Sequence, residues 1–307
     1  MKRKSVLQFI VTSFLVAVLT AACGLFGTTD TPQSTTGTKS PVASTQVVKI
    51  GAIVPLTGSN AYLGEGERLG MQLALANYPD MESKVSFIFE DSKGKPEVAL
   101  SAARKLLDVQ NVNIHIVATS GVALATLPMY KESGKDLLVF AQATFPKVTK
   151  DYPFAYRIYT SADEEARLLA SYAKKKGYLR VGALYLRNRV FEESNKLFQK
   201  EIEPYGGKVV ISESFANEDK DIKPLLEKLK QSNLDAIFVY GFATNLPTIA
   251  NQMDEVGLKL PVLVNSIIAS AGIDKKLPPD FLKQVVFPVP RYFTAKEDVR
   301  IQEFNKK

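Results

Sequence analysis

The stretch that decides the fold is residues 47–77, which read VVKIGAIVPLTGSNAYLGEGERLGMQLALAN. They begin with an almost continuous apolar run over 47–54, of the kind that forms a strand buried on both faces of a parallel sheet. A loop rich in Gly, Ser and Thr follows, and an amphipathic pattern predicts a helix over 65–77. A strand that leads through a loop into a helix is the repeating unit of layered α/β folds.

The same unit recurs along the chain. Further strands are predicted over 85–90, 114–119, 137–142, 181–186, 209–215, 236–242, 262–265 and 285–289. Further helices are predicted over 96–109, 122–133, 162–176, 191–204, 222–231 and 246–256. Pro96 in a first turn, and Gly134 and Gly177 just after a last one, are typical helix boundaries. Strand then helix, repeated without exception, predicts doubly wound parallel sheets of the α/β class.

The chain before this body has the build of an export signal. Lys2, Arg3 and Lys4 are followed by an apolar run over 6–22 that ends in small residues before Cys23, the only cysteine. The run is shorter than the ~20 residues that cross a bilayer. Residues 1–22 resemble a bacterial lipoprotein signal peptide, which implies cleavage and acylation at Cys23. An ordinary signal peptide with a chance cysteine is the alternative.

Residues 23–46 are rich in Thr and Ser and poor in large apolar groups, so they predict a flexible linker between the lipid anchor and the body. The expected location is extracytoplasmic, on a bacterial membrane. The body of about 260 residues is long enough for two lobes. The formal charge of +7 falls to +4 when Lys2, Arg3 and Lys4 are removed, which is too small and dispersed to indicate nucleic acid.

Ligands bind doubly wound sheets at the carboxyl ends of the strands, so the functional residues are expected in the loops there. The first loop contains Gly64 and Gly66, but Leu69 stands where a dinucleotide loop needs its third glycine, and no cofactor is expected. The third and fourth strands end in hydroxyl residues, Ser120 and Thr144. Hydroxyls and free amides at a helix N-terminus suit a carboxylate or another anion.

At these residues a family resemblance emerges. VKIGAIVPLTG over 48–58, then Gly64, Ser120 and Thr144, resemble the type I periplasmic substrate-binding proteins of branched-chain amino acid ABC importers. The resemblance runs from Val47 to the last residue. It implies two Rossmann-like lobes joined by three crossovers, with residues 47–160 plus 288–307 in lobe 1 and 161–287 in lobe 2.

The resemblance also implies which residues bind the ligand. They are Leu63, Ser120, Gly121, Gln142, Ala143, Thr144, Val190, Phe242 and Ser266. Ser120 and Thr144 match the pair that holds the ligand carboxylate. In the second lobe, however, Val190 replaces a common tyrosine, Phe242 lacks a hydroxyl, and Ser266 or Ile267 occupies the usual acidic position. A buried ammonium without a charged partner is costly, so an ordinary α-amino acid is not expected.

A set of polar residues lies at the end of the predicted strand 181–186. Tyr185, Arg187, Asn188 and Arg189 either meet a second anionic group of the ligand or form a solvated basic loop. Both interpretations stay open from the sequence.

Catalytic chemistry is not expected. His115, the only histidine, alternates with isoleucines in a strand and is interpreted as structural. With Cys23 lipidated, no thiol remains for a Cys/His system, and a zinc site lacks its usual ligands. Glu90–Asp91 is interpreted as a strand-end cap, and Lys174–Lys176 as a solvated helix C-terminus.

The sequence therefore predicts a solute-binding lipoprotein that binds a small molecule by hinge closure and delivers it to the permease of an ABC importer. A receptor module for a signalling partner is the alternative within the fold. A lipid-anchored dehydrogenase or hydrolase is the alternative of another class. The chain stops at Lys307 inside an expected returning helix, which is interpreted as a truncated first lobe, with a naturally shortened variant as the other possibility.

Overall fold

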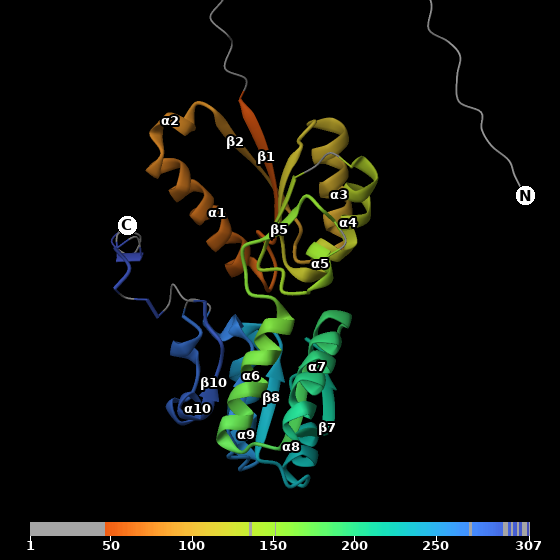
Figure 1. The fold of residues 1–307 in the computed structure, drawn as a ribbon, viewed down its shortest axis with the longest axis vertical. Helices are drawn as coiled ribbons and strands as arrows, with labels where there is room; N and C mark the ends of the chain where they lie inside the picture. The colour runs from red at the N-terminus through yellow and green to blue at the C-terminus, as the bar shows by residue number, and fades with distance from the viewer. Residues whose placement is uncertain are drawn as a thin grey trace, which may run out of the picture. The chain divides into compact units, whose positions relative to one another are not determined.

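The structure is a computed structural model. It describes residues 47–307 apart from 135–136, 151, 270–271, 291–293, 296, 300, 303–305 and 307. The predicted signal peptide, Cys23 and the linker lie outside the described residues. Within the described part, the strands form two parallel five-stranded sheets (Figure 1).

The first sheet has the strand order β2-β1-β3-β4-β5. Its strands are β1 (Val48–Val54), β2 (Val85–Asp91), β3 (Ile114–Ala118), β4 (Leu137–Ala141) and β5 (Ala155–Arg157). Its helices are α1 (Ala61–Asn77), α2 (Pro79–Glu82), α3 (Pro96–Arg104), the π-helical turn Lys105–Val109, α4 (Ser120–Ser133) and α5 (Lys147–Lys150). In Figure 1, α1 lies on one side of this sheet and α3 and α4 on the other. We call this sheet and its helices the first lobe.

The second sheet has the order β10-β9-β8-β6-β7. Its strands are β6 (Arg180–Leu186), β7 (Lys208–Phe215), β8 (Ala236–Tyr240), β9 (Val262–Val264) and β10 (Val285–Val286). Its helices are α6 (Ala162–Lys176), α7 (Arg189–Ile202), α8 (Lys223–Lys230), α9 (Leu246–Glu255) and α10 (Pro279–Gln284), with short 3₁₀ turns at Glu203–Tyr205, Ala243–Asn245, Ser266–Ala269 and Asp274–Lys276. We call this sheet and its helices the second lobe.

Local chemistry explains the best-predicted helix, α6. Its first turn carries Asp163 and Glu164 and its last turn carries three lysines, so both ends complement the helix dipole. Gly177 ends it in the left-handed region with φ of 75°. The helix has the predicted bounds 162–176, because its end signals coincide with the ends of its apolar pattern.

Each lobe has its own apolar core. In the second lobe, Phe198 of α7 and Phe238 of β8 stack with ring centroids 4.3 Å apart. Burying a side chain of this size contributes about 1.5–3 kcal/mol. In the first lobe, Ile53 and Phe140 pack under α3 and α4. The two cores hold the strand ends, and therefore the loops that follow them, in fixed positions.

Close packing sets the start of α1. A Cβ atom at Gly64 would lie 2.2 Å from the carbonyl oxygen of Pro55, so only glycine lets the helix begin this close to the loop after β1. Asp91 holds the same loop from the other side. Its carboxylate accepts hydrogen bonds from the backbone amides of Leu56 and Lys93 and from the Thr57 hydroxyl. The predicted capping role of Asp91 is confirmed, while Glu90 pairs with Lys105.

Strand and helix alternate along the described chain as predicted, but the edge strand β5 and the four-residue helix α5 before it were not predicted. Pro146 and Pro153 flank this segment and leave no room for a periodic pattern. The third and fourth strands also end one residue early. Thr119 and Gln142 have positive φ angles of 64° and 50°, which turn the chain out of the sheet.

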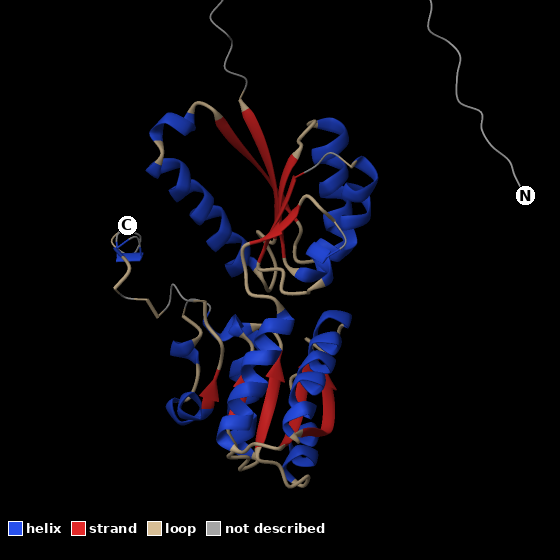
Figure 2. Cartoon of the chain, viewed as in Figure 1, coloured by secondary structure: helices blue, strands red, loops and turns tan. Residues whose placement is uncertain are grey.

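The lobes are connected through the segment 158–161, between β5 and α6. The Ala162 amide donates to the Thr144 carbonyl over 2.7 Å, which joins the second lobe to the loop after β4. Strands of both sheets point their carboxyl ends toward this connection (Figure 2). The predicted lobe boundaries at 160/161 and 287/288 stay predictions. Among the described residues, we find no helix with the length and apolar character that a membrane crossing requires.

Candidate ligand-binding site

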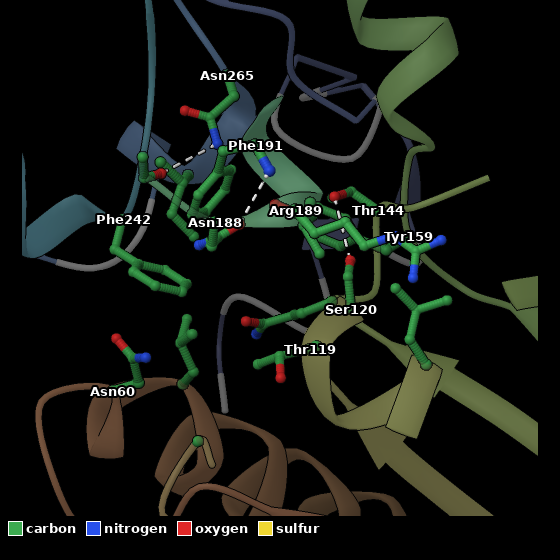
Figure 3. A pocket seen from close by; sticks show the side chains of 18 of the residues that line it. Asn60, Thr119, Ser120, Thr144, Tyr159, Asn188, Arg189, Phe191, Phe242 and Asn265 are labelled. Carbon is green, nitrogen blue, oxygen red and sulfur yellow. Dashed lines mark hydrogen bonds between the residues drawn. The ribbon is translucent and has the colours of Figure 1, made fainter. Parts of the chain in front are cut away.

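A cavity of about 520 Å³ lies where strand ends of both lobes meet (Figure 3). This volume is within the usual range for small-molecule sites. Its first-lobe lining comes from the start of α1, the loop before α3, the start of α4 and the end of β4. Its second-lobe lining comes from the start of α7 and the ends of β8 and β9. Both sheets therefore contribute to one site.

One corner of the cavity has the features expected of an anion site. Ser120 is the first residue of the 14-residue helix α4, whose N-terminal amides and dipole favour negative charge. The Ser120 Oγ accepts a hydrogen bond from the Phe145 amide over 3.1 Å and lies 3.5 Å from the Thr144 Oγ1. Figure 3 shows the two hydroxyls facing each other, Ser120 from the start of α4 and Thr144 from the loop after β4. Because Ser120 accepts from the Phe145 amide, the proton of its hydroxyl can be donated either to the Thr144 Oγ1 or to a ligand oxygen.

The rest of the cavity is largely apolar. Phe191 and Phe242 of the second lobe pack edge to face, with ring centroids 5.1 Å apart and planes at 81°. Val190 and Ile267 extend this surface, and Leu63 faces it from the first lobe. Aromatic rings in this arrangement provide a rigid surface for a flat or branched apolar group.

The described lining of the cavity carries a positive side chain and no negative one. None of the described residues that line the cavity is an aspartate or a glutamate, and Arg189 supplies a cation. Arg189 is exposed and has no acidic partner within the described part of the chain. Both interpretations of the loop stay open for Arg189, which is exposed, as a solvated loop predicts, and also lines the cavity, as contact with an anionic ligand group requires. Of its neighbours, Asn188 caps α7 through the Phe191 amide, and Arg187 instead bonds Ser214.

A buried carboxylate lies behind the second-lobe lining. Glu165 of α6 accepts hydrogen bonds from the hydroxyl and the amide of Ser266 on one oxygen, and from the Tyr240 hydroxyl over 3.1 Å on the other. The Tyr159 hydroxyl is 3.0 Å from the Ser266 Oγ. Burial raises the pKa of Glu165, and the hydrogen bonds from Ser266 and Tyr240 oppose that rise. Burial and the charge of Glu165 raise the pKa of Tyr240 well above its usual value.

Three amide side chains place acceptors beside the cavity. The Oδ1 atoms of Asn60 and Asn265 and the Oε1 atom of Gln142 are buried without a hydrogen-bond partner in the described structure. The orientation of Asn265 follows from its Nδ2, which donates to the Gly241 carbonyl over 3.3 Å. Buried acceptors normally have a partner, so these oxygens are suited to a bound water or a ligand donor.

Eight of the nine predicted site residues line this cavity. They are Leu63, Ser120, Gly121, Gln142, Thr144, Val190, Phe242 and Ser266. Ala143 does not line it, because its side chain is buried in the first-lobe core. Their role in binding stays a prediction. Sequence reasoning missed Asn60, Tyr159, Phe191 and Asn265; the helix-capping position of Asn60 and the strand-end position of Asn265 were the available signals.

The other candidates have structural roles. His115 is buried, its Nε2 is 2.8 Å from the Val112 carbonyl, and its ring packs on Tyr130. Lys174–Lys176 is exposed at the end of α6, as predicted. The described residues contain no cluster of three or more His, Cys, Asp or Glu side chains that could hold a metal ion.

Two parallel α/β lobes with a cavity at their strand ends define a two-lobe ligand-binding protein. The chain belongs to the periplasmic binding protein family, whose model matches residues 47–307. The predicted family and fold class are thus confirmed. The family and its structural neighbours are substrate-binding proteins, not enzymes.

Particular relatives agree with this assignment. The chain is 25% identical over 222 residues to Leu/Ile/Val-binding protein homolog 3 of Brucella melitensis, covering 70% of this chain and 60% of that protein. A leucine binding protein from Thermotoga maritima superposes with a TM-score of 0.77 at 22% identity, over 85% of this chain and 75% of the other. The chain also superposes on a solute binding protein of an ABC transporter from Rhodopseudomonas palustris, in complex with 3,4-dihydroxybenzoic acid. The TM-score is 0.73 at 20% identity, and the match covers 84% of this chain and 72% of the other.

Proposed function

We propose that this protein is an extracytoplasmic solute-binding protein that captures a small carboxylate and delivers it to an ABC importer. The observation that carries the proposal is the pair of hydroxyls on Ser120, at the N-terminus of α4, and Thr144, in the loop after β4, in the same cavity as the apolar second-lobe residues. The names of the relatives, a Leu/Ile/Val-binding protein and an ABC solute binding protein with a dihydroxybenzoic acid, are consistent with a carboxylate ligand.

The proposed mechanism is closure of the two lobes about the ligand. The carboxylate binds first to Ser120, Thr144 and the free amides of α4, which belong to the first lobe. Val190, Phe191 and Phe242 of the second lobe then contact the body of the ligand. A ligand that touches both lobes only in the closed form shifts the population toward that form. The hinge is proposed to include residues 158–161, at the predicted boundary between 47–160 and 161–287.

Titration calorimetry with small carboxylates tests this function. We expect binding that Ser120→Ala weakens, and we expect no binding of the corresponding primary alcohols, which lack the negative charge. Equal affinity for an acid and its alcohol would contradict anion binding by Ser120 and Thr144. Small-angle scattering with and without the bound acid tests closure, because the radius of gyration should decrease on binding.

The location and the anchor form a separate part of the proposal. Cys23 is proposed to carry the lipid, and residues 23–46 to tether the body to the membrane. Covalent acyl chains contribute about 0.8 kcal/mol for each buried methylene, so several chains give stable anchoring. Incorporation of a labelled fatty acid in the wild type, and its loss in Cys23→Ser, would support this part. Labelling of Cys23→Ser would contradict it.

A further inference from the structure

We infer that the ligand carries no ammonium group and is an apolar monocarboxylate, with an aromatic or branched aliphatic body. This inference rests on the proposed function and narrows its ligand class. It follows from where the protein places its acidic side chains around the cavity.

The carboxylate position fixes where an ammonium would lie. In an α-amino acid the ammonium is bonded to the carbon next to the carboxylate, so a carboxylate at Ser120 and Thr144 leaves the ammonium inside the same cavity. No aspartate or glutamate is among the described lining residues, and the charged side chain there, Arg189, is also a cation. A desolvated ammonium would therefore gain no opposite charge from the lining.

The buried acid behind Ser266 cannot substitute for the missing one. Glu165 lies behind Ser266, and both of its oxygens are occupied, one by Ser266 and the other by Tyr240. Turning Glu165 toward the ligand would leave those buried donors without an acceptor. The hydroxyl that Ser266 would offer a ligand already donates to Glu165 and lies 3.0 Å from the Tyr159 hydroxyl. The carboxyl group of Glu165 is therefore engaged within the second lobe and not turned to the cavity.

The acceptors beside the cavity suit neutral donors instead. The amide oxygens of Asn60, Gln142 and Asn265 have no partner in the described structure. They accept a hydrogen bond from a hydroxyl but bring no charge to offset an ammonium. The edge-to-face pair of Phe191 and Phe242 provides the surface for the apolar body. A hydroxyl substituent on that body would satisfy one of the amide oxygens.

Matched pairs of acids test the inference directly. We would titrate the full chain, purified in detergent at neutral pH, with 4-methylpentanoate against leucine, and with 3-phenylpropanoate against phenylalanine. The members of each pair differ only in the α-ammonium. We expect the deamino acid of at least one pair to bind about 100-fold more tightly than its amino acid, the size of effect that an unpaired buried charge produces. Benzoate and 4-hydroxybenzoate extend the series to shorter bodies.

The outcomes separate this inference from the proposed function. Equal or tighter binding of the amino acid in every pair that binds would overturn the inference and leave the carboxylate function in place. Absence of binding by every acid, to protein shown to be folded by circular dichroism, would overturn both.

A gain-of-charge variant tests the physical reason. Ile267 lines the cavity beside Ser266, so Ile267→Asp adds an acid without disturbing Glu165, and Ile267→Asn is the matched neutral control. We expect the aspartate variant to shift the preference toward leucine over 4-methylpentanoate by at least about tenfold, and the asparagine variant to shift it much less. Equal shifts in the two variants would contradict the electrostatic explanation.

Discussion

Replacing Glu67 by glutamine will stabilise the protein at neutral and alkaline pH and remove part of its dependence on pH. Glu67 is in the second turn of α1, and both of its carboxylate oxygens are buried without a hydrogen-bond partner in the described structure. Burial raises the pKa of Glu67 from 4.5 to about 8. The folded protein therefore holds this carboxyl neutral at pH 7, whereas the unfolded chain ionises it.

The direction of the pH dependence of stability follows from proton binding. Between pH 4.5 and about 8 the folded state binds more protons at Glu67 than the unfolded state, so its contribution to stability falls as pH rises through this window. Below the window the contribution is fully present. One pKa unit corresponds to 1.36 kcal/mol, so the loss reaches about 3 kcal/mol at pH 7 and approaches about 5 kcal/mol above pH 8. Glutamine has a similar shape and does not titrate, so the variant should keep this stability.

The assay is urea unfolding of the wild type and Glu67→Gln at pH 5, 7 and 9. The free energy of unfolding of the variant, minus that of the wild type, should grow with pH by a few kcal/mol. Glu65→Gln, on the same helix but paired with Arg68 at the surface, is the control and should show no such growth. A difference that stays constant from pH 5 to 9 would refute the argument, since it would mean that Glu67 is ionised in the folded protein.

Three other substitutions test the packing and the site. Gly64→Ala should destabilise the fold by about 2 kcal/mol or more, because the added Cβ would meet the backbone of Pro55. The control Gly66→Ala, whose Cβ would have nothing within 4 Å, should be neutral or stabilising by up to about 1 kcal/mol. Thermal unfolding measures both changes, and equal effects would contradict the contact at Gly64. Ser120→Ala should weaken binding of a carboxylate by about 1–3 kcal/mol in calorimetry, and an unchanged affinity would remove Ser120 from the site. Glu165→Ala should lower the unfolding free energy by about 3 kcal/mol by leaving buried donors unpaired. Glu164→Ala, at a half-exposed side chain that pairs with Arg167 on the surface, should change it by less than about 1 kcal/mol, and similar losses would contradict the buried network.

The sequence was informative about the fold because parallel strands buried on both faces leave a continuous apolar signature. The run over 47–54 and the helix over 162–176 were predicted from such patterns and their end signals. Strand β5 was not predictable in this way. It has only three residues, it forms the sheet edge, and Tyr156 in its centre is exposed, so it lacks both the length and the continuity of a buried strand.

The site was predictable where it depends on local sequence. Ser120 and Thr144 follow strands, and strand ends at one edge of a parallel sheet are close in space, so their position beside one cavity follows from the topology. The hydrogen bonds of Glu165 were not predictable. Its partner Tyr240 is 75 residues away and Ser266 is 101 residues away, and no periodicity encodes a contact at such separation.

Under the proposed ligand class, the buried network of Glu165 contributes to ligand selectivity along with the residues that line the cavity. If Glu165 were mobile, a ligand ammonium could draw its carboxylate into the cavity. That movement would break the hydrogen bonds from Ser266 and Tyr240, and each buried donor left unpaired costs about 1–3 kcal/mol. The loss is comparable to what a new buried ion pair would return after both of its charges are desolvated. Substitution of Glu165 should therefore change stability before it changes ligand preference, whereas an acid added at Ile267 should do the reverse.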